Sequence, residues 1–243
     1  MERPNTNVPL EMLAAKTVLC CGEDFGELMR AMAAVTTRAP VREHAYRGYR
    51  FVQFEDFALA WCGIGTGCLE PLLCEVLRQG RITRMVLMGT AGCLDPTGAE
   101  LGTPYLVGEA WLGGTAIRPR DPDAPRRPHW PHAPAVLAPR SIVSTDFYYG
   151  FSPVAHPLRD ALLAHDAGLA EELAQHLPRC PLVDMESAQF YHLCRALEGD
   201  ALEFVAVKAA ANHVGAWQAQ LENTPAALQA CWRASLDLLD LPL

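Results

Sequence analysis

The stretch Val183-Asp184-Met185-Glu186-Ser187-Ala188 places two carboxylates around a methionine, where an apolar predicted strand ends. The apolar side chains that follow recur at helical spacing and predict an amphipathic helix: Phe190, Leu193, Cys194 and Leu197. The carboxylates would therefore lie at the carboxyl end of a strand, where open α/β sheets bind small ligands. A carboxylate fixed there can accept hydrogen bonds from sugar hydroxyls. The alternative is that Asp184 or Ser187 simply caps the start of the helix.

Apolar runs of strand length alternate with helical patterns on both sides of this stretch. Strands are predicted at Thr17–Cys21, Ala58–Cys62, Met85–Met88, Tyr105–Val107, Ile142–Ser144 and Phe204–Val207. Helices are predicted at Gly26–Val35, Leu69–Leu77 and Ala226–Leu239. Several strands are apolar on both faces, as central strands covered by helices should be. The alternation predicts one α/β domain, residues 1–243, with a mainly parallel or mixed sheet flanked by helices.

Residues 117–139 differ from the rest of the chain. The segment holds seven prolines together with several arginines, two histidines and Trp130. Proline at this density precludes regular structure, so the segment is predicted to lie outside the sheet. Two interpretations remain open: a passive or partly disordered surface insertion, and a lid or subunit contact.

The composition excludes several classes of protein. The net charge of −8 argues against a nucleic-acid or anionic-membrane partner, because a protein binds such phosphates through clustered Lys and Arg side chains. The only lysines are Lys16 and Lys208. Nine cysteines with no C-x-x-C pair predict free thiols in a reducing cytoplasm rather than disulfides or a zinc site. No apolar run has the length of a signal sequence or membrane span. We therefore expect a cytoplasmic protein that needs no metal and no cofactor.

Two glycine-rich motifs follow predicted strands. Gly63-Ile64-Gly65-Thr66-Gly67 opens a predicted helix, and its glycines let the backbone approach a ligand closely. It is not a dinucleotide fingerprint, since no acidic residue ends a following strand at the usual distance. Gly89-Thr90-Ala91-Gly92-Cys93-Leu94 offers a hydroxyl and backbone N–H groups that can hold a phosphate or an activated water. The alternative for Thr90 is an ordinary turn hydroxyl.

Two further motifs supply side chains suited to a flat heterocycle. Ser144-Thr145-Asp146-Phe147-Tyr148-Tyr149-Gly150 places aromatic rings at a sheet edge, where a base can stack, although Tyr148 could equally pack in the core. In Val207–Gly215, the Asn212 amide can donate and accept side by side, which matches the edge of an oxopurine. A turn or helix cap is the alternative role for Asn212.

The order and spacing of five motifs resemble the nucleoside phosphorylase and nucleosidase superfamily, of the purine nucleoside phosphorylase and uridine phosphorylase type. The motifs are G-I-G before a helix, G-T-A-G-C-L, S-T-D-F-Y-Y, V-D-M-E-S-A and K-A-A-A-N-H-V-G. Methylthioadenosine/S-adenosylhomocysteine nucleosidase-like and futalosine hydrolase-like members are the most similar. The resemblance implies a mixed central sheet, partly closed into a barrel and flanked by helices. It also implies a homo-oligomer that cleaves the N-glycosidic bond of a purine-type nucleoside.

The resemblance assigns roles around the sugar. Glu186 matches the glutamate that binds the ribose hydroxyls, and Met185 matches the methionine packed under the sugar. Thr90 matches the hydroxyl residue that contacts phosphate or the attacking water. Gly65 and Gly89 belong to the motifs that complete the substrate site. The bond would break through an oxocarbenium-like cation, with hydrogen bonds to the leaving base and carboxylate contacts to the ribose.

The resemblance also assigns residues at the base. Tyr148 matches the aromatic position stacked on the base. Asn212 stands where many members have an aspartate that protonates purine N7. Asparagine instead resembles members that act on 6-oxopurines, futalosine hydrolases in particular.

The acceptor of the glycosyl group is predicted from two positions at which this sequence is compared with the phosphorylases and nucleosidases that it resembles. Leu87 replaces the arginine that holds phosphate in hexameric phosphorylases, so the phosphate site looks incomplete. Nucleosidases place a water-activating glutamate after the first strand, where this chain has Gly22-Glu23-Asp24-Phe25-Gly26-Glu27. Glu23 and then Glu27 are the candidates for that glutamate, and both positions favour water as the acceptor.

Two alternatives remain open at this point. One is a phosphate-dependent phosphorylase that uses arginines from elsewhere, such as Arg38 or Arg42 of a neighbouring subunit. The other is a non-catalytic nucleoside-binding protein on the same fold, which the altered residue at position 212 favours.

Overall fold

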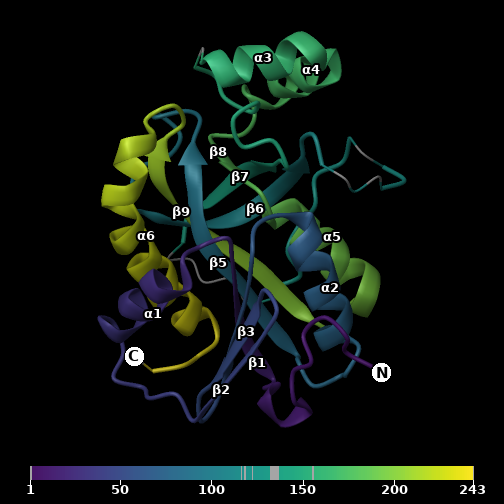
Figure 1. Cartoon of the computed structure of the whole chain (residues 1–243), viewed down its shortest axis with the longest axis vertical. Coiled ribbons are helices and arrows are strands. Elements are labelled where there is room, and N and C mark those ends of the chain that lie inside the picture. Colours follow the sequence, from purple (N-terminus) through teal and green to yellow (C-terminus); the bar gives the residue numbers. More distant parts are fainter. Residues whose placement is uncertain are drawn as a thin grey trace.

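The computed structural model describes residues 2–115, 117, 119–121, 123–131, 137–154 and 156–242. Within them a sheet has the strand order β2-β3-β4-β1-β5-β8-β7-β6-β9, and β5 also pairs with β9. The strands are β1 Lys16–Cys21, β2 Arg42–Tyr46, β3 Tyr49–Gln53, β4 Ala58–Cys62, β5 Arg84–Cys93, β6 Pro104–Leu112, β7 Pro139–Ser144, β8 Leu182–Asp184 and β9 Glu203–His213. The pairing of β5 with β9 closes β5, β8, β7, β6 and β9 into a barrel, and the other four strands extend it as an open sheet (Figure 1).

Helices cover both faces of this sheet. They are α1 Phe25–Ala33, α2 Thr66–Leu77, α3 Pro157–His165, α4 Ala167–His176, α5 Ser187–Glu198 and α6 Trp217–Leu238, with a 3-10 turn at Leu10–Met12. One apolar cluster contains residues of α2 and α5, and a second contains residues of α1 and α6. Figure 1 shows these two pairs on opposite sides of the sheet, with α3 and α4 beyond one end of the barrel. The predicted fold class, a mixed and partly barrel-like sheet flanked by helices, is confirmed.

The sequence of the central strand β5 is a continuous apolar run because both faces of the strand are buried. Met85 and Leu87 belong to the cluster beneath α2 and α5, whereas Val86 and Met88 belong to the cluster beneath α1 and α6. All four side chains are fully buried. A strand covered by helices on both faces has no exposed face for polar residues, so the period-2 alternation is lost.

Three strands run well past their predicted ends: β5, β6 and β9. Gly89–Cys93 pairs with the end of β9 as part of β5, with a register shift between Ala91 and Gly92. The Gly89 and Lys208 motifs were predicted to follow the strands at Met85–Met88 and Phe204–Val207, and instead they continue β5 and β9. Glycines and alanines indicate a loop in sequence, but here they continue the longest ladder of the barrel and bring Thr90 and Asn212 onto adjacent strands.

Four elements were not predicted from the sequence: β2, β3, α3 and α4. β2 and β3 form a hairpin through Arg47-Gly48, with Arg47 at a positive φ of 50°. Four of the five residues of β2 are exposed, and α3 buries none of its residues. β2 and α3 therefore lack the apolar face that marks an element in sequence, whereas β3 buries Tyr49, Phe51 and Val52 and α4 buries Leu169 and Leu173.

The proline-rich segment is anchored to the barrel where it is described. Arg126 bridges to Ala110 of β6 and His129 bridges to Phe204 of β9, and Pro139 already begins β7. Trp130 is 9% exposed, within the cluster beneath α1 and α6. The described part is therefore not a passive insertion, although it holds no helix and no strand before Pro139. Arg118, Pro122 and residues 132–136 lie outside the described residues.

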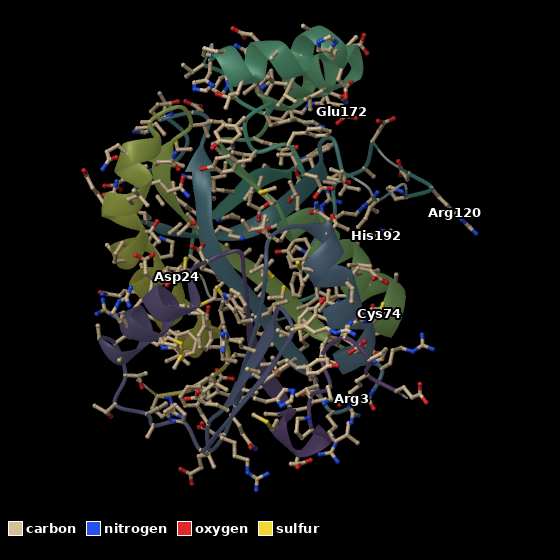
Figure 2. The ribbon with its side chains drawn as sticks, in the orientation of Figure 1. Arg3, Asp24, Cys74, Arg120, Glu172 and His192 are labelled. Carbon is tan, nitrogen blue, oxygen red and sulfur yellow. The ribbon has the colours of Figure 1, made fainter. Side chains whose placement is uncertain are left out.

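Replacing Trp130 tests this anchoring. The Arg84 guanidinium lies 4.9 Å from the centre of the Trp130 ring, and the ring packs into the core. Trp130→Ala should lower the free energy of unfolding by about 3 kcal/mol, measured by denaturant unfolding, because a buried aromatic ring is lost. Arg120→Ala is the matched control in the same segment. Figure 2 shows the Arg120 side chain projecting away from the barrel, and this exposed change should cost no more than about 0.5 kcal/mol. Equal costs would contradict the anchoring.

Three further features bear on the compositional predictions. All nine cysteines are free thiols, as predicted. Among the described residues, no group of His, Cys, Asp or Glu side chains is arranged to hold a metal ion. None of the described helices combines the length and the hydropathy that crossing a bilayer requires.

Candidate active site

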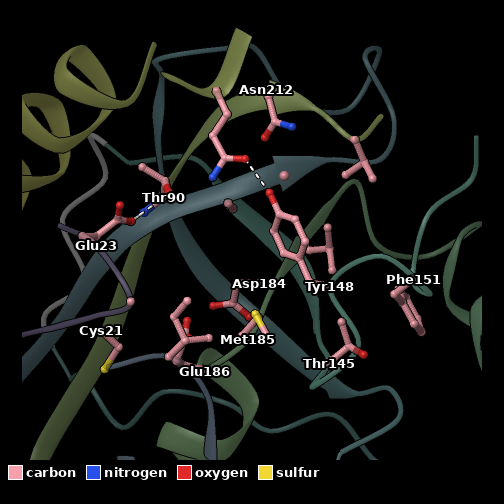
Figure 3. A pocket seen from close by; sticks show the side chains of 17 residues that line it. Cys21, Glu23, Thr90, Thr145, Tyr148, Phe151, Asp184, Met185, Glu186 and Asn212 are labelled. Carbon is pink, nitrogen blue, oxygen red and sulfur yellow. Dashed lines mark hydrogen bonds between the residues drawn. The ribbon is translucent and has the colours of Figure 1, made fainter. Parts of the chain in front are cut away.

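An open cavity of about 750 Å³, its mouth included, lies at the carboxyl ends of β1, β5, β7 and β8 and beside the end of β9. Six of the predicted site residues line it: Glu23, Thr90, Tyr148, Met185, Glu186 and Asn212 (Figure 3). They come from five separate segments of the chain, since Met185 and Glu186 are adjacent, and the strands of the sheet bring these segments together. The fold thus gathers residues of the five motifs and the loop after the first strand around one space.

Three other predicted residues do not line the cavity. The Gly65 N–H donates to Glu186 Oε1 at 3.2 Å, and Gly65 has a φ of +80°, which favours glycine. Gly89 lies behind Glu23, since a Cβ added at Gly89 would come within 3.3 Å of Glu23 Oε1. Glu27 lies in the first turn of α1, where its N–H donates to Asp24 Oδ1. The two glycines therefore support the side chains of the site, and Glu23 rather than Glu27 faces the cavity.

Glu186 is a buried carboxylate at the floor of the cavity. Its side chain is 6% exposed, Oε1 accepts the Gly65 N–H, and Oε2 lies 3.4 Å from Lys208 Nζ. Glu186 is the N-cap residue of α5, yet its side chain makes no capping bond. Burial raises the pKa of Glu186 to about 7, against the opposing effect of Lys208 and with a further increase from the Asp184 carboxylate.

Asp184 holds the junction between β8 and α5 together. Its Oδ2 accepts the Ser187 N–H at 3.1 Å and the Ser187 hydroxyl at 2.5 Å, while Oδ1 accepts the Ser144 hydroxyl at 2.5 Å. Ser144 Oγ in turn accepts the Ala188 N–H. Helix capping and ligand binding were the two interpretations of the stretch 183–188, and they apply to different residues. Asp184 stabilises the start of the helix, and Glu186 faces the cavity.

Lys208 is the residue that the sequence analysis passed over. Its side chain is 1% exposed, and Nζ lies 3.1 Å from Asp184 Oδ2. Burial alone would lower the pKa of Lys208, but the Asp184 and Glu186 carboxylates raise it. The sequence did indicate this residue, because Lys208 is a lysine within the apolar run of β9. A buried lysine is almost always paired with carboxylates.

Glu23 and Thr90 form the second contact at the floor. Glu23 Oε1 accepts the Thr90 N–H at 2.6 Å and the Thr90 hydroxyl at 2.8 Å (Figure 3). Trp61 Nε1 donates to the Glu23 carbonyl oxygen at 2.9 Å, which fixes the loop after β1. The donors that could have held an anion are therefore occupied by a carboxylate.

The other end of the cavity carries neutral polar and aromatic side chains. The Tyr148 hydroxyl donates to Gln220 Oε1 at 2.6 Å, and the Tyr148 ring lies within the cavity (Figure 3). Asn212 is 4% exposed, and its Nδ2 donates to the His213 carbonyl oxygen at 3.1 Å. Gln220 was not predicted, because the last helix was predicted to begin at Ala226 whereas α6 begins at Trp217.

Comparison with known proteins gives a result at the level of the fold. No family model and no curated protein matches the sequence. Among solved structures, a methylthioadenosine/S-adenosylhomocysteine nucleosidase from Colwellia psychrerythraea, in complex with adenine, has a TM-score of 0.68 at 14% identity over 94% of this chain and 96% of that chain. Futalosine hydrolase of Helicobacter pylori has a TM-score of 0.66 at 12% identity over 93% of this chain and 98% of that chain. Purine nucleoside phosphorylase from Toxoplasma gondii, in complex with immucillin-H, has a TM-score of 0.65 at 18% identity over 97% of each chain.

The chain has the nucleoside phosphorylase fold. Within this fold its cavity is acidic: Glu23, Asp184 and Glu186 line it, and none of the described lining residues is an arginine or lysine. Leu87, at the position where the resemblance expects a phosphate-binding arginine, is fully buried in the core.

The two arginines considered as substitutes lie elsewhere in this nucleoside phosphorylase fold. Arg38 pairs with Asp56, donates to the Pro242 carbonyl oxygen and lies over the Phe57 ring. Arg42 lies on β2, with its side chain 56% exposed. Neither residue lines the cavity of its own chain.

Proposed function

We propose that this protein is an enzyme that hydrolyses the N-glycosidic bond of a purine-type nucleoside, with water as the acceptor. The observation that carries the proposal is the contact between Glu23 and Thr90. One carboxylate oxygen accepts both the N–H and the hydroxyl of Thr90, at 2.6 and 2.8 Å. A carboxylate in this position suits a general base that takes a proton from water, and it repels a phosphate dianion.

The charges around the cavity support the same choice of acceptor. Glu23, Asp184 and Glu186 are opposed by one buried ammonium, that of Lys208. Bringing a phosphate dianion beside these carboxylates, without an arginine to pair with it, would cost several kcal/mol. Water carries no such penalty, and Thr90 and the backbone around it offer polar groups that can position it.

The sugar is assigned to the side of the cavity formed by the β8–α5 junction. Glu186 would accept hydrogen bonds from the ribose hydroxyls, and Met185 would pack beneath the ring. As the glycosidic bond breaks, positive charge develops on the ribose, and the nearby carboxylates of Glu23 and Glu186 stabilise it. The attacking water would lie between Glu23 and the sugar.

The leaving base is assigned to the side formed by Tyr148, Asn212 and Gln220. The Tyr148 ring can stack on a purine, and the Asn212 and Gln220 amides can bond to its edge. A neutral amide cannot transfer a proton to N7 as a carboxylic acid can. We therefore propose that the enzyme prefers 6-oxopurine nucleosides, whose leaving group relies less on full protonation at N7.

The solved structures with the same fold support a small nucleoside ligand. The Colwellia enzyme was solved with adenine and the Toxoplasma enzyme with immucillin-H. Those complexes describe the two proteins themselves.

A panel of nucleosides tests the proposed activity. Inosine-like, futalosine-like, adenosine-like and 5′-methylthioadenosine-like substrates would be incubated with the protein, and release of free base and of reducing sugar would be measured. Hydrolysis yields a reducing sugar in amounts equal to the base, whereas phosphorolysis yields a sugar phosphate that is not reducing. Purine binding without release of base would instead support a non-catalytic binding protein.

Asn212→Asp tests the assignment of the base. The carboxyl of the variant can donate to N7 when protonated but no longer donates as an amide to O6, so preference should move toward 6-aminopurines. We expect the ratio of kcat/KM for inosine over adenosine to fall by about 10-fold or more, which corresponds to roughly one lost hydrogen bond. His213→Ala is the control, because His213 is exposed and does not line the cavity. An unchanged ratio in Asn212→Asp would contradict the assignment.

We also propose that the enzyme is a homo-oligomer and that it works in the cytoplasm. Neither proposal depends on the geometry of the cavity. Sedimentation at several protein concentrations tests the first, and cell fractionation tests the second.

A further inference from the structure

A buried ammonium lies directly behind the proposed ribose site. Lys208 Nζ is 3.1 Å from Asp184 Oδ2 and 3.4 Å from Glu186 Oε2, and the three side chains are at most 6% exposed. Lys208 does not line the cavity, so it would act on a substrate through Glu186. We propose that Lys208 is a positioning residue that keeps the Glu186 carboxylate ionised and fixed at the cavity floor, while Asp184 holds Lys208 in place. This inference rests on the proposed function, in which Glu186 binds the ribose.

The fold makes a place for this ammonium. Lys208 of β9 pairs in register with Gly89 of β5. A Cβ added at Gly89 would lie 3.4 Å from Lys208 Nζ and 3.3 Å from Glu23 Oε1. Nζ therefore lies beside Gly89 at the floor of the cavity, on the strand next to the one that carries Thr90.

Hydrogen bonds hold the Asp184 carboxylate in place beside Lys208. Its two oxygens accept hydrogen bonds from the Ser144 hydroxyl and from the N–H and hydroxyl of Ser187. These donors come from β7 and α5, so the carboxylate is fixed from both sides. It also lies closer to Lys208 Nζ than Glu186 does, at 3.1 Å against 3.4 Å.

The charge of Glu186 depends on this arrangement. Burial raises the pKa of Glu186 to about 7, and Lys208 is the neighbour whose charge most opposes that increase. Among the described groups, the carboxylates of Asp184 and Glu23 raise the pKa of Glu186. The thiols of Cys20, Cys21 and Cys68 are also close enough to interact with its charge. Without the ammonium, the pKa of Glu186 would rise further, so more of the carboxyl would be protonated at neutral pH and would lose acceptor capacity toward the ribose hydroxyls.

The pH dependence of kcat/KM tests whether Lys208 controls the ionisation of Glu186. Because the pKa of Glu186 is raised, its ionised form is present above pH 7 and is lost as the pH falls through about 7. The wild-type protein should therefore show an acidic limb near that pH. In Lys208→Met the limb should move up by at least about one pH unit, so that kcat/KM at pH 7 falls about 10-fold or more and partly recovers by about pH 9. Lys208→Arg should keep the limb near its wild-type position.

Two further variants make the test independent of how well Lys208→Met folds. Asp184→Asn removes a like charge beside Glu186 but retains Lys208, so its limb should move to lower pH. Lys16→Met removes the other lysine of the chain, which lies outside the cavity, and should leave the profile unchanged. A loss in Lys208→Met that is the same at every pH, or an unmoved limb in Asp184→Asn, would overturn the inference and leave Lys208 a merely structural residue.

A direct measurement separates this inference from the proposed function. The infrared band of the protonated Glu186 carboxyl, assigned by its loss in Glu186→Gln, reports ionisation without turnover. The band should form as the pH falls through about 7 in the wild type. It should form at higher pH in Lys208→Met and at lower pH in Asp184→Asn. If no nucleoside is cleaved but these shifts are found, the proposed function fails and the control of Glu186 by Lys208 stands; identical midpoints in all three proteins overturn it.

Discussion

Glu186→Gln should lower kcat/KM for the preferred nucleoside by roughly 30- to 1,000-fold, which corresponds to about 2–4 kcal/mol of lost transition-state stabilisation. The variant replaces a charged acceptor with an amide that has one acceptor oxygen, at the position proposed to bind the ribose hydroxyls. Steady-state kinetics with a base-release assay measures the effect. A value of kcat/KM within about twofold of wild type would show that the ribose does not contact Glu186.

The same substitution should leave the protein folded. Burial raises the pKa of Glu186 to about 7, so the ionised side chain costs folding free energy at pH values above that point. A neutral glutamine removes this cost, and the melting temperature at pH 8 should therefore stay near or above that of the wild type. Glu27→Gln is the matched control, since Glu27 lies in the first turn of α1 and outside the cavity. It should change neither the rate nor the melting temperature appreciably.

Glu23→Gln is the second substitution with a large expected effect. A general base contributes about 10²- to 10⁴-fold to rate, so kcat should fall by that order while KM changes little. The glutamine oxygen can still accept from the N–H and hydroxyl of Thr90, so the floor of the cavity should keep its shape. Stopped or continuous assays of base release, over a range of substrate concentrations, separate kcat from KM.

The phosphate dependence of Glu23→Gln distinguishes the two acceptors. Neutralising Glu23 removes a charge that repels phosphate from Thr90. If the protein were a phosphorylase, the variant should gain activity with added phosphate, whereas a hydrolase should lose activity at every phosphate concentration. A variant as fast as wild type without phosphate would show that Glu23 is not the base.

Much of the site could be predicted because its motifs lie at or near the ends of predicted strands, where α/β sheets bind small ligands. The four motifs were each weak, but their places after predicted strands implied that Thr90, Tyr148, Glu186 and Asn212 would meet, and they do line one cavity. The alternation of apolar runs likewise predicted the central strands and the flanking helices. These features depend on local patterns that a single sequence carries.

The remaining features depend on contacts between distant segments. The choice between Glu23 and Glu27 depends on the turn after β1, where Gly22 has a φ of +77°. Lys208 was visible as a residue, but its carboxylate partners come from β8 and the start of α5. Gln220 enters the cavity because α6 begins upstream of Pro225. The strand β2 and the helix α3 bury too little apolar surface to leave a pattern.

The measurement that tests the central claim most directly is the origin of the oxygen added to the sugar. The reaction would be run in ¹⁸O-labelled water, with and without a saturating concentration of inorganic phosphate, and the sugar product analysed by mass spectrometry. We predict free ribose or its 5′ derivative that carries one ¹⁸O atom introduced at C1, in the same amount and at the same rate whether or not phosphate is present. Because C1 of a free sugar exchanges oxygen with water, the product must be trapped by rapid reduction, and a control of unlabelled sugar in labelled water corrects for exchange. Recovery of ribose 1-phosphate without ¹⁸O, at a rate that saturates with phosphate, would contradict hydrolysis and make the protein a phosphorylase.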